Sequence, residues 1–578
     1  MKHVLAVTLL CFFCSGINAE THSRTTVRVG MWTLWHDKEV TISPLTGATL
    51  RTCQSCRAEP LKTIVVQMNS GLLTWTQNGR ARTATALFLT GTYRLAAHGE
   101  SVTLAFPLKV TPRAGKLLIV AEVPVERYVE LVVAAESGQA DGPESRRALA
   151  VVARSFALQP GHRHAEFDVC DSTHCQWVHW HTTPQAHAAT LATAGESLWR
   201  NGTRVEAYFN QNCGGHTAAA SEAWPARSAQ EHEARNTLTS RPDPYCQRAG
   251  RSEWSAELSR LELAQALAAA GLARPGWKTL EVVQRGESGR ATMLQIGSQQ
   301  IAAEDFRLAI GRALGWNRIR SNWYEIATEG DVFLFHGRGS GHGVGLCQTG
   351  TATMAQEGRS YGEILAQYFP QTTLADSTTG AAWKSLSGPM QSGPGFALKT
   401  TEPSDAQYIP VLACALEEAK RRSGLEQGTT IAVRTYRSTS AFRDATLAPG
   451  WVAAFTEGNQ IDLQPLRILA ARKLLESVLL HEFLHALVEA QAAPRTPLWF
   501  REGLVEVWSG YTTRGPKPNL TLDKVNAELV HSSTEAESEA AHRSAGWYAS
   551  QLIAHFGLPQ VLEWLRSDLP QSALAFLR

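Results

Sequence analysis

The sequence predicts an α+β protein: a mixed strand-rich and helical part, linked to a mainly helical C-terminal domain with a small sheet. Three observations predict this fold class. Short alternating apolar runs broken by Gly, Pro and Asn fill residues 25–123, as expected of strands. Apolar residues recur at helical spacing in 125–158, and a long apolar helical run covers 466–489. A chain of 578 residues with 44% apolar and 19% charged residues can bury several cores.

The pattern along the chain predicts four segments after a leader. Residues 20–122 are strand-rich, 123–371 form a mixed core, 372–395 form a linker rich in Thr, Ser, Gly and Pro, and 396–578 form the C-terminal domain. We expect helices at 123–138, 145–157, 259–270, 411–424, 466–489 and 545–556. We expect strands at 26–29, 63–66, 198–208, 280–296, 430–436 and 451–463.

The leader has the pattern of a secretory signal peptide. A basic start precedes an apolar run, Val4 to Cys14, and a candidate cleavage site at Ile17 to Ala19. We therefore expect residues 1–19 to be removed and the protein to be exported, to the periplasm or the cell wall. No later segment reaches the roughly 18 consecutive apolar residues of a membrane helix, so we expect no membrane span.

The overall charge disfavours one class of partner. The chain has 55 Lys and Arg against 53 Asp and Glu, a formal net charge of +2. A balance this close to neutral provides no electrostatic reason to bind a polyanion, so we expect no nucleic acid partner.

Cysteine use points to disulfides or metal. Two of the ten cysteines lie in the leader, and in an oxidising compartment the remaining eight form disulfides by default. We expect a local disulfide between Cys53 and Cys56, and Cys213 and Cys246 are candidate partners.

Glu136 is a candidate general acid because it closes the helix predicted at 123–138. Negative charge at a helix C-terminus is unfavourable by about 0.3 to 1 kcal/mol, which raises the pKa of the carboxyl group and suits a proton donor at neutral pH. The alternative is an ordinary surface glutamate beside a glycine cap. Arg147 and Arg154 share one face of the next helix, where they either hold anions and acids or form a solvated edge.

Two thiols and a histidine cluster in the loop that follows. His164, Cys170 and Cys175 lie within about twelve residues, close enough to ligate one tetrahedral Zn²⁺ with an open fourth position. A short disulfide between Cys170 and Cys175 is the alternative. Several other histidines lie nearby, so the residue types alone do not select the ligand.

Two glycine-rich segments are candidates for ligand binding. One contains Gly214 and Gly215 after a predicted strand, and the other contains His342 and ends at Gln348, before a helix. Glycines at this density let backbone N–H groups approach a ligand closely, and a purely structural turn is the alternative. No Lys-Ser or Lys-Thr follows, so this is not a nucleotide-binding P-loop.

The sharpest spacing lies in the C-terminal domain. His481 and His485 stand four residues apart in an apolar helix, so both can bind one Zn²⁺, and Glu482 can polarise a metal-bound water. Glu502 is the expected third ligand, with Glu506 one turn later as the second choice. The alternative is a core helix with two buried histidines and a surface glutamate.

Five ordered blocks resemble a known family: VPVERYVELVVAAESG, RRALAVVARSFAL, CDSTHCQ, FNQNCGGHT and GRGSGHGVGLCQTGTATMAQEGRSYGEILAQYFP. They resemble the stage II sporulation protein D family, which includes amidase-enhancer-like proteins, over roughly 250 residues. Two departures are that Ser155-Phe156 replaces the usual Thr-Tyr and that Cys347 stands where Ser is frequent.

This resemblance implies a lytic transglycosylase that cuts peptidoglycan glycan strands with one acid, Glu136, and leaves a 1,6-anhydro product. It implies catalytic roles for Arg147, Arg154 and His342, and a zinc site in some members that matches His164, Cys170 and Cys175. We expect the glycan to contact Gln176, Gly214, Gly215 and Gln348. From the residues alone, Asp168 and Asp171 leave open a hydrolase with two carboxylates.

The C-terminal motif HEFLH followed by WFREGLVEVW resembles the gluzincin clan of metallopeptidases over roughly 170 residues. The resemblance implies Zn²⁺ held by His481, His485 and Glu502, with Glu482 as base and Tyr548 stabilising the oxyanion.

Together these observations predict an exported peptidoglycan lytic transglycosylase fused to a zinc metallopeptidase-like domain. One alternative is a zinc peptidase whose N-terminal part only binds peptidoglycan. The other is a non-enzymatic amidase enhancer that binds glycan strands and recruits a cell-wall amidase.

Overall fold

The computed structural model describes residues 26–577 except 36, 139–140, 160–163, 225–237, 251, 275, 388–394, 450, 511–516 and 532–533. The predicted signal peptide, residues 1–19, lies outside the described residues. The described part combines a large sheet, several small sheets and a helical C-terminal region, which confirms the α+β class. Within these residues, no helix is long and apolar enough to cross a lipid bilayer.

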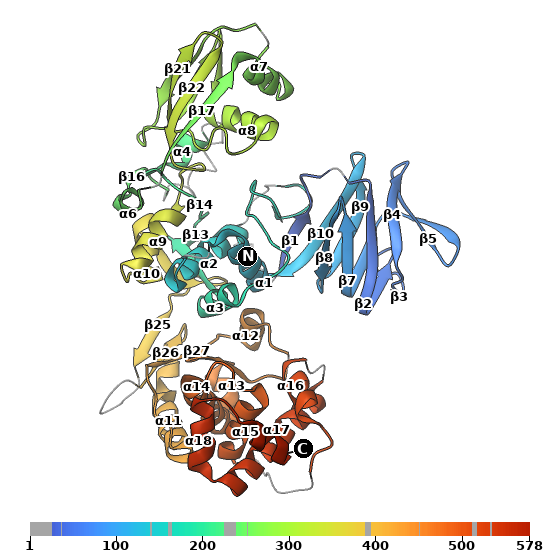
Figure 1. Cartoon of the computed structure of the whole chain (residues 1–578), viewed down its shortest axis with the longest axis vertical. Coiled ribbons are helices and arrows are strands. Elements are labelled where there is room, and N and C mark those ends of the chain that lie inside the picture. The colour runs from blue at the N-terminus through green and yellow to red at the C-terminus, as the bar shows by residue number, and fades with distance from the viewer. Residues whose placement is uncertain are drawn as a thin grey trace, which may run out of the picture.

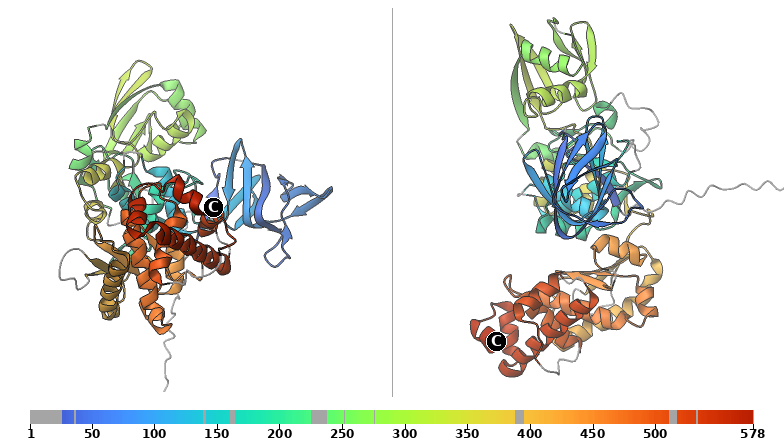
Figure 2. Two further views of the ribbon diagram at one scale, coloured as in Figure 1. Left: turned by 60° about the horizontal axis from the view of Figure 1, so that its bottom comes forward. Right: turned by 90° about the vertical axis from the view of Figure 1, so that its right-hand side faces the viewer.

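The molecule is elongated, with four parts (Figure 1). The N-terminal sheet projects from one side of a helical centre. A small α/β unit stands at one end of the molecule and the C-terminal domain at the other. The right-hand view of Figure 2 shows the same separation of the two ends.

An 11-stranded sheet forms the N-terminal part. Its strands are β1 (Thr26–Met31), β2 (Glu39–Arg51), β3 (Glu59–Pro60), β4 (Ile64–Asn69), β5 (Leu72–Gln77), β6 (Arg80–Ala84), β7 (Leu87–Ala97), β8 (Glu100–Leu104), β9 (Leu108–Arg113), β10 (Lys116–Pro124) and β11 (Val169–Cys170). The main order is β11-β1-β10-β9-β7-β2-β4-β5-β6, with β3 beside β2 and β8 beside β7. Alternate residues are buried over the first four residues of β1 and of β4, the period that a strand requires, which confirms the predicted strand-rich start.

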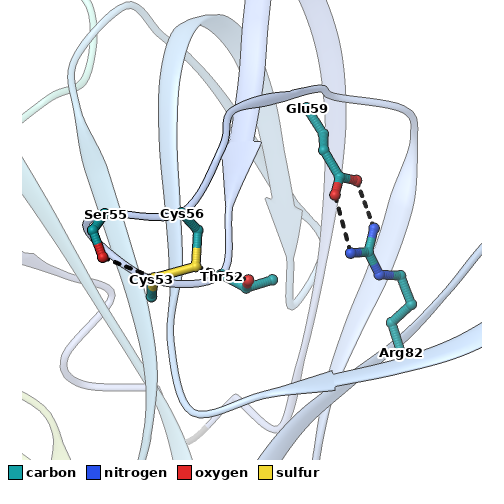
Figure 3. Close-up of a disulfide and its surroundings, with 6 residues drawn as sticks. All are labelled: Thr52, Cys53, Ser55, Cys56, Glu59 and Arg82. Carbon is teal, nitrogen blue, oxygen red and sulfur yellow. Dashed lines mark hydrogen bonds and ion pairs between the residues drawn. A yellow bond between two sulfur atoms is a disulfide. The ribbon is translucent and has the colours of Figure 1, made fainter.

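A local disulfide joins Cys53 and Cys56 in the loop between β2 and β3, as predicted (Figure 3). Near this disulfide, Arg82 of β6 forms a bidentate ion pair with both carboxylate oxygens of Glu59 on β3. The suggested pairing of Cys213 with Cys246 is wrong, because both thiols are free.

Three helices form the centre: α1 (Val125–Glu136), α2 (Pro143–Ala157) and α3 (Pro184–Ala192). α1 continues directly from β10, and Pro124 is its N-cap. α2 and α3 also begin at proline, whose missing N–H costs nothing in the first turn of a helix. The helices predicted at 123–138 and 145–157 are thereby confirmed to within a few residues, and the sheet sets the direction of α1.

Short strands and helices complete the centre. Strands β12 (Glu196–Arg200), β13 (Thr203–Arg204) and β24 (Thr373–Asp376) form one sheet; β14 (Phe209–Asn210) pairs with β23 (Leu346–Cys347), and β15 (His216–Thr217) with β16 (Arg241–Pro242). The helices are α4 (Ala220–Ala223), α6 (Pro244–Arg248), α9 (Gln348–Gln356) and α10 (Tyr361–Tyr368). The parallel β14–β23 pair, whose paired residues stand 137 positions apart in the sequence, brings together the two glycine-rich segments.

The small α/β unit has its own hydrophobic core, which includes Leu258, Phe306 and Phe333. A single core over 123–371 was predicted, so the sequence missed this division. Its elements are β17 (Glu253–Ser259), α7 (Arg260–Ala269), β18 (Leu280–Arg285), β19 (Ala291–Ile296), β20 (Gln299–Ala302), α8 (Ala303–Leu314), β21 (Tyr324–Glu329) and β22 (Val332–Arg338).

The C-terminal domain packs helices on a five-stranded sheet of order β25-β26-β27-β29-β28. The strands are β25 (Lys384–Ser387), β26 (Phe396–Thr400), β27 (Ile431–Thr435), β28 (Ala454–Glu457) and β29 (Gln460–Leu463). The helices are η1 (Pro403–Tyr408), α11 (Ile409–Ser423), α12 (Thr439–Thr446), α13 (Leu466–Ala471), α14 (Leu475–Gln491), α15 (Leu498–Ser509), α16 (Leu522–His531), α17 (Glu535–Phe556), α18 (Leu558–Arg566) and α19 (Gln571–Leu577).

Two predicted boundaries in this region are wrong. The single helix at 466–489 is two helices, α13 and α14, because Lys473 between them adopts a left-handed backbone with φ +58°. The linker predicted at 372–395 is partly strand: β24 joins the central sheet, and β25 pairs with β26. Residues 388–394 lie outside the described part.

Buried charges join the C-terminal sheet to the centre. Arg434 of β27 donates hydrogen bonds to the carbonyl oxygens of Leu191, in the last turn of α3, and of Ala194, just after that helix. Lys399 of β26 forms an ion pair with the fully buried Glu196 of β12. The two parts of the chain are therefore in direct polar contact.

Candidate functional site

Glu136 is the last residue of α1, and two other segments reach it. The backbone N–H of Trp177 donates to its Oε1 at 3.0 Å, and Gln348 Nε2, at the start of α9, donates to its main-chain oxygen at 2.9 Å. Burial raises the pKa of Glu136 to about 7, and the hydrogen bond from Trp177 only partly opposes this. The carboxyl group is therefore partly protonated at neutral pH, as a general acid must be.

The segment Gln176 to Trp177 lines this carboxyl group. Gln176 is buried and accepts a hydrogen bond from the hydroxyl of Tyr128 on α1, which holds the residue before Trp177 against that helix. The Trp177 side chain is 45% exposed. An exposed indole beside an acid offers a flat apolar surface to a sugar ring. The sequence analysis did not predict Trp177 as a site residue. Its position directly after Gln176, at the start of the histidine-rich segment, is the sequence feature that could have indicated it.

Among the described residues, neither Arg147 nor Arg154 of α2 forms a hydrogen bond or ion pair with Glu136. Arg147 pairs with Glu144 on its own helix, at 2.5 Å, and is partly exposed. Arg154 is fully buried, grips both carboxylate oxygens of Glu126, and donates to the main-chain oxygen of Glu196. No surface of the Arg154 guanidinium is left for a substrate, so the structure does not support the predicted direct catalytic contact; Arg154 instead joins α1 to β12.

The glycine-rich segments also serve packing. Gly214 and Gly215 both have positive φ, and a side chain at Gly215 would collide with Gln247. His342 Nδ1 accepts the N–H of Val344, and its ring contacts Tyr208 and Trp224. Among the described residues, none of the hydrogen bonds or ring contacts of His342 involves Glu136.

Asp168 and Asp171, the two carboxylates that left open a hydrolase with two acids, both form hydrogen bonds with neighbouring segments. Asp168 pairs with Arg28 of β1 through both oxygens. Asp171 accepts the N–H of Trp32 and the indole N–H of Trp180. Each therefore ties the loop around β11 to neighbouring segments.

The predicted histidine and cysteine cluster is assembled and gains a fourth member. His164 Nε2 lies 3.3 Å from Cys175 Sγ, and His174 Nδ1 lies 3.7 Å from the sulfur atoms of both Cys170 and Cys175. All four ligand atoms lie within 4.8 Å of one another. No disulfide joins Cys170 to Cys175, so that alternative is not adopted. Two sulfur and two nitrogen donors fit a tetrahedral Zn²⁺.

A second cluster forms on α14 and α15. His481 Nε2 and His485 Nε2 are 3.0 Å apart, and Glu502 Oε2 lies 3.4 Å from His485 Nε2. Among the described residues, Glu502 Oε2 is buried and has no hydrogen-bond partner, as expected of a carboxylate oxygen that binds a metal ion. The Ser509 hydroxyl lies 3.2 Å from His481 Nδ1, which orients the ring. The donor set of two imidazoles and one carboxylate fits Zn²⁺.

The groups around this cluster differ in part from those predicted. Thr456 of β28 donates to Glu482 Oε2 at 2.5 Å, and burial raises the pKa of Glu482 to about 7. The hydroxyl of Tyr548 donates to the carbonyl of Leu520, so the predicted oxyanion role of Tyr548 is not supported. His542 of α17, which the sequence analysis missed, lies 3.5 Å from Glu502 Oε2 through its Nδ1.

Comparisons with known families place two matches on the N-terminal part and the centre. Residues 113–199 match the family described as Stage II sporulation protein, and they contain Glu136 and the histidine and cysteine cluster. Residues 198–345 match a domain of unknown function, DUF8618.

Three relatives extend the similarity. An uncharacterized protein of Brachyspira hyodysenteriae is 29% identical over 278 residues, 46% of this chain and 71% of that protein. Stage II sporulation protein D of Bacillus subtilis is 24% identical over 302 residues, 49% of this chain and 83% of that protein. The amidase enhancer of Bacillus subtilis is 22% identical over 228 residues, 32% of each chain. The N-terminal part of this chain is therefore similar to stage II sporulation protein D and to the amidase enhancer, as its motifs led us to expect.

Proposed function

We propose that this protein acts on the bacterial cell wall, as an exported lytic transglycosylase that cuts peptidoglycan glycan strands. The observation that carries the proposal is the Glu136 carboxyl group. At the end of α1 it accepts the backbone N–H of Trp177, whose side chain is exposed, and its pKa is raised to about 7. The side-chain amide of Gln348 donates to the main-chain oxygen of the same residue.

A single acid is enough for this chemistry. Protonated Glu136 donates its proton to the glycosidic oxygen as the bond to C1 breaks, and the carboxylate then accepts the proton of the sugar's own C6 hydroxyl as that oxygen bonds to C1. The proton returns to Glu136, and the product is a 1,6-anhydro sugar with no water consumed. Asp168 and Asp171, already bonded to neighbouring groups, are not needed as a second carboxylate.

The proposal is tested by mass spectrometry of glycan strands free of stem peptides, incubated with the mature chain and with Glu136→Gln. We expect anhydro-ended fragments from the wild type and at least about 100-fold fewer from the variant, because general acid catalysis contributes about 10²- to 10⁴-fold. Glu100→Gln, on the exposed strand β8, is the matched control and should cleave normally.

An intact substrate with folded wild-type protein would contradict cleavage by Glu136. Glycan binding without cleavage, together with stimulation of an added cell-wall amidase, would favour the non-enzymatic enhancer instead. The similarity to the amidase enhancer of Bacillus subtilis makes that the second candidate function.

We propose in addition that the C-terminal domain is a gluzincin-like zinc metallopeptidase. His481, His485 and Glu502 would hold the metal, which supplies Lewis acidity to a peptide carbonyl and to water. Glu482 lies beside them with its Oε2 held by Thr456, so it can accept a proton from the attacking water. His542 Nδ1 lies 3.5 Å from Glu502 Oε2, so this histidine can hold a proton close to the metal ligands.

Peptide hydrolysis should be measured on a mixture of unstructured peptides and on stem peptides, with and without a chelator. We expect Glu482→Gln to abolish hydrolysis while leaving bound zinc unchanged, and Glu476→Gln, exposed on the same helix, to be active. Hydrolysis that survives Glu482→Gln would contradict the assignment. Bound zinc with no hydrolysis of any peptide would leave the glycan activity as the function of the chain.

A further inference from the structure

The centre of the molecule contains a third cluster of ligand atoms that neither the proposed catalytic chemistry nor the family resemblance uses. Cys213, Cys246, Cys347 and Asp243 are all essentially inaccessible to solvent, with exposed fractions of 0 to 1%. Their sulfur and carboxylate oxygen atoms lie within 4.8 Å of one another. We propose that these four residues form a structural Zn²⁺ site with three thiolates and one carboxylate.

The geometry suits a four-coordinate ion. Sulfur atoms bound to one tetrahedral zinc at about 2.3 Å stand about 3.8 Å apart, so the cluster needs only small side-chain shifts to close. The Cys213 thiol already lies 3.1 Å from Asp243 Oδ2. All four ligands come from the protein and none is exposed, which is the pattern of a structural zinc site with no open position.

Neighbouring groups are arranged for negative charge on the sulfur atoms. Cys347 Sγ accepts the backbone N–H of Cys213 at 3.2 Å and that of Gly350 at 3.4 Å, at the N-terminus of α9. Asp243 is oriented from both sides: Oδ1 accepts the N–H of Cys246, and Oδ2 accepts the hydroxyl of Tyr368. Such outer hydrogen bonds are typical of metal ligands.

A buried cation beside the cluster is the second, independent observation. Arg290 is 2% exposed and donates to the main-chain oxygens of Cys213 and His216, while its Nε has no hydrogen-bond partner. Among the described residues, no carboxylate pairs with Arg290. Glu222 offsets the cost of this buried guanidinium only through a longer-range coulombic attraction, and an anionic zinc–thiolate centre next to it would offset more of that cost.

A disulfide explains the cluster less well. Only two of the three sulfur atoms could join, which would leave a buried thiol and the buried carboxylate of Asp243 beside the bond. In the structure all three thiols are free. Zinc uses all four groups: binding releases the three thiol protons and forms three Zn–S bonds and one Zn–O bond.

The position of the site indicates what it stabilises. Cys213 lies in the turn after β14, Asp243 and Cys246 lie at α6, and Cys347 ends β23 directly before Gln348. One ion would therefore tie together three segments distant in sequence. It would hold the amide of Gln348 against Glu136 without taking part in the chemistry.

Zinc per chain should be measured by elemental mass spectrometry on the full mature chain, purified with a reductant and equilibrated with ZnCl₂. We expect Cys246→Ser to bind one zinc fewer per chain than the wild type. Cys414→Ser, which alters an exposed free thiol of α11, should bind the same number as the wild type. Equal zinc content in the two variants would overturn the proposal. The difference isolates this site from the two candidate zinc sites described above.

Thiol mapping on the wild type decides the case in which Cys246→Ser does not fold. We expect Cys213, Cys246 and Cys347 to be recovered as reduced thiols, and to be alkylated at least about tenfold faster after a chelator removes zinc. A peptide map that shows a Cys213–Cys246 disulfide, or alkylation that the chelator does not change, would overturn the site. Neither readout depends on the proposed glycan or peptide hydrolysis.

Discussion

His187 Nε2 of α3 lies 3.5 Å from Glu457 Oε2 of β28, so an imidazole of the centre meets a carboxylate of the C-terminal domain. The other ring nitrogen lies 3.4 Å from Glu130 Oε2 on α1, the helix that ends at Glu136. The residue before Glu457 is Thr456, which holds Glu482. A continuous series of contacts therefore runs between the two candidate active sites.

The contact at His187 should make the stability of the whole chain pH-dependent. Glu130 and Glu457 raise the pKa of His187, while burial and Arg127 on α1 oppose the shift. A raised folded-state pKa means that the stabilisation is complete below the unfolded value of about 6.5 and is lost as pH rises through the folded value. We expect thermal scans between pH 6 and 8 to show this loss in the wild type and a smaller loss in His187→Gln. Identical pH dependence would exclude a contribution from this histidine.

Glycan cleavage should fall on the alkaline side of about pH 7. The pKa of Glu136 is raised to about 7 by burial, so the acid form is lost above that pH. Because the acid form starts the reaction, the rate should fall about tenfold per pH unit well above the pKa. The pH profile of anhydro-product release measures this. A rate that rises steadily to pH 9 would contradict acid catalysis by Glu136.

The same shift predicts an effect on stability. The folded carboxyl group of Glu136 keeps its proton to higher pH than the unfolded one, so its stabilising contribution is lost as pH rises from about 4.5 to about 7. Glu136→Gln cannot ionise. The unfolding free energy of the variant minus that of the wild type should therefore be larger at pH 8 than at pH 5, as measured by denaturant unfolding at the two pH values. The reverse order would mean that burial does not raise this pKa.

The buried pair between Lys399 and Glu196 should be important for holding the C-terminal domain in place. Lys399→Met leaves the carboxylate of Glu196, which is 0% exposed, without its lysine partner. Because Arg434, at 3.9 Å, and the Tyr361 hydroxyl still contact that carboxylate, the loss should be smaller than the about 3 to 5 kcal/mol of an uncompensated buried charge. We expect a lower denaturation midpoint and faster proteolysis between the two parts. Lys524→Met, on the exposed face of α16, is the control and should change stability by less than about 0.5 kcal/mol. Equal behaviour of the two variants would count against the pair.

Zinc at the His481–His485 cluster should stabilise the C-terminal domain. A ligand at 100 times its dissociation constant adds about 2.7 kcal/mol to the free energy of unfolding. We expect added Zn²⁺ to raise the melting temperature of the wild type but to have a smaller effect on His485→Ala. His555→Ala, which removes an exposed histidine of α17, should respond as the wild type does. If His485→Ala responded fully to zinc, the stabilising ion would have to bind elsewhere.

Local pattern was sufficient for four of the helices. The period of apolar residues predicted α1, α2, α7 and α11 to within a few residues, because helix formation depends on neighbours three and four positions away. The same period placed His481 and His485 on one face of α14. It failed at Lys473, where a single left-handed residue divides the predicted helix, since no sequence signal distinguishes that lysine from its neighbours.

The sequence by itself determined which chemistry the chain carries: an acid at the end of a helix, a histidine and cysteine loop, and a two-histidine helix with Glu482 between. Only the tertiary structure decided which of these groups are free to act. In the folded chain Arg154 is buried in an ion pair with Glu126, and the hydroxyl of Tyr548 donates a hydrogen bond to the carbonyl of Leu520. Cys213 and Cys347, which are 134 residues apart in the sequence, lie in contact. The reason is physical: spacing along a helix is a local property, whereas burial and pairing depend on which distant segments the folded core brings into contact.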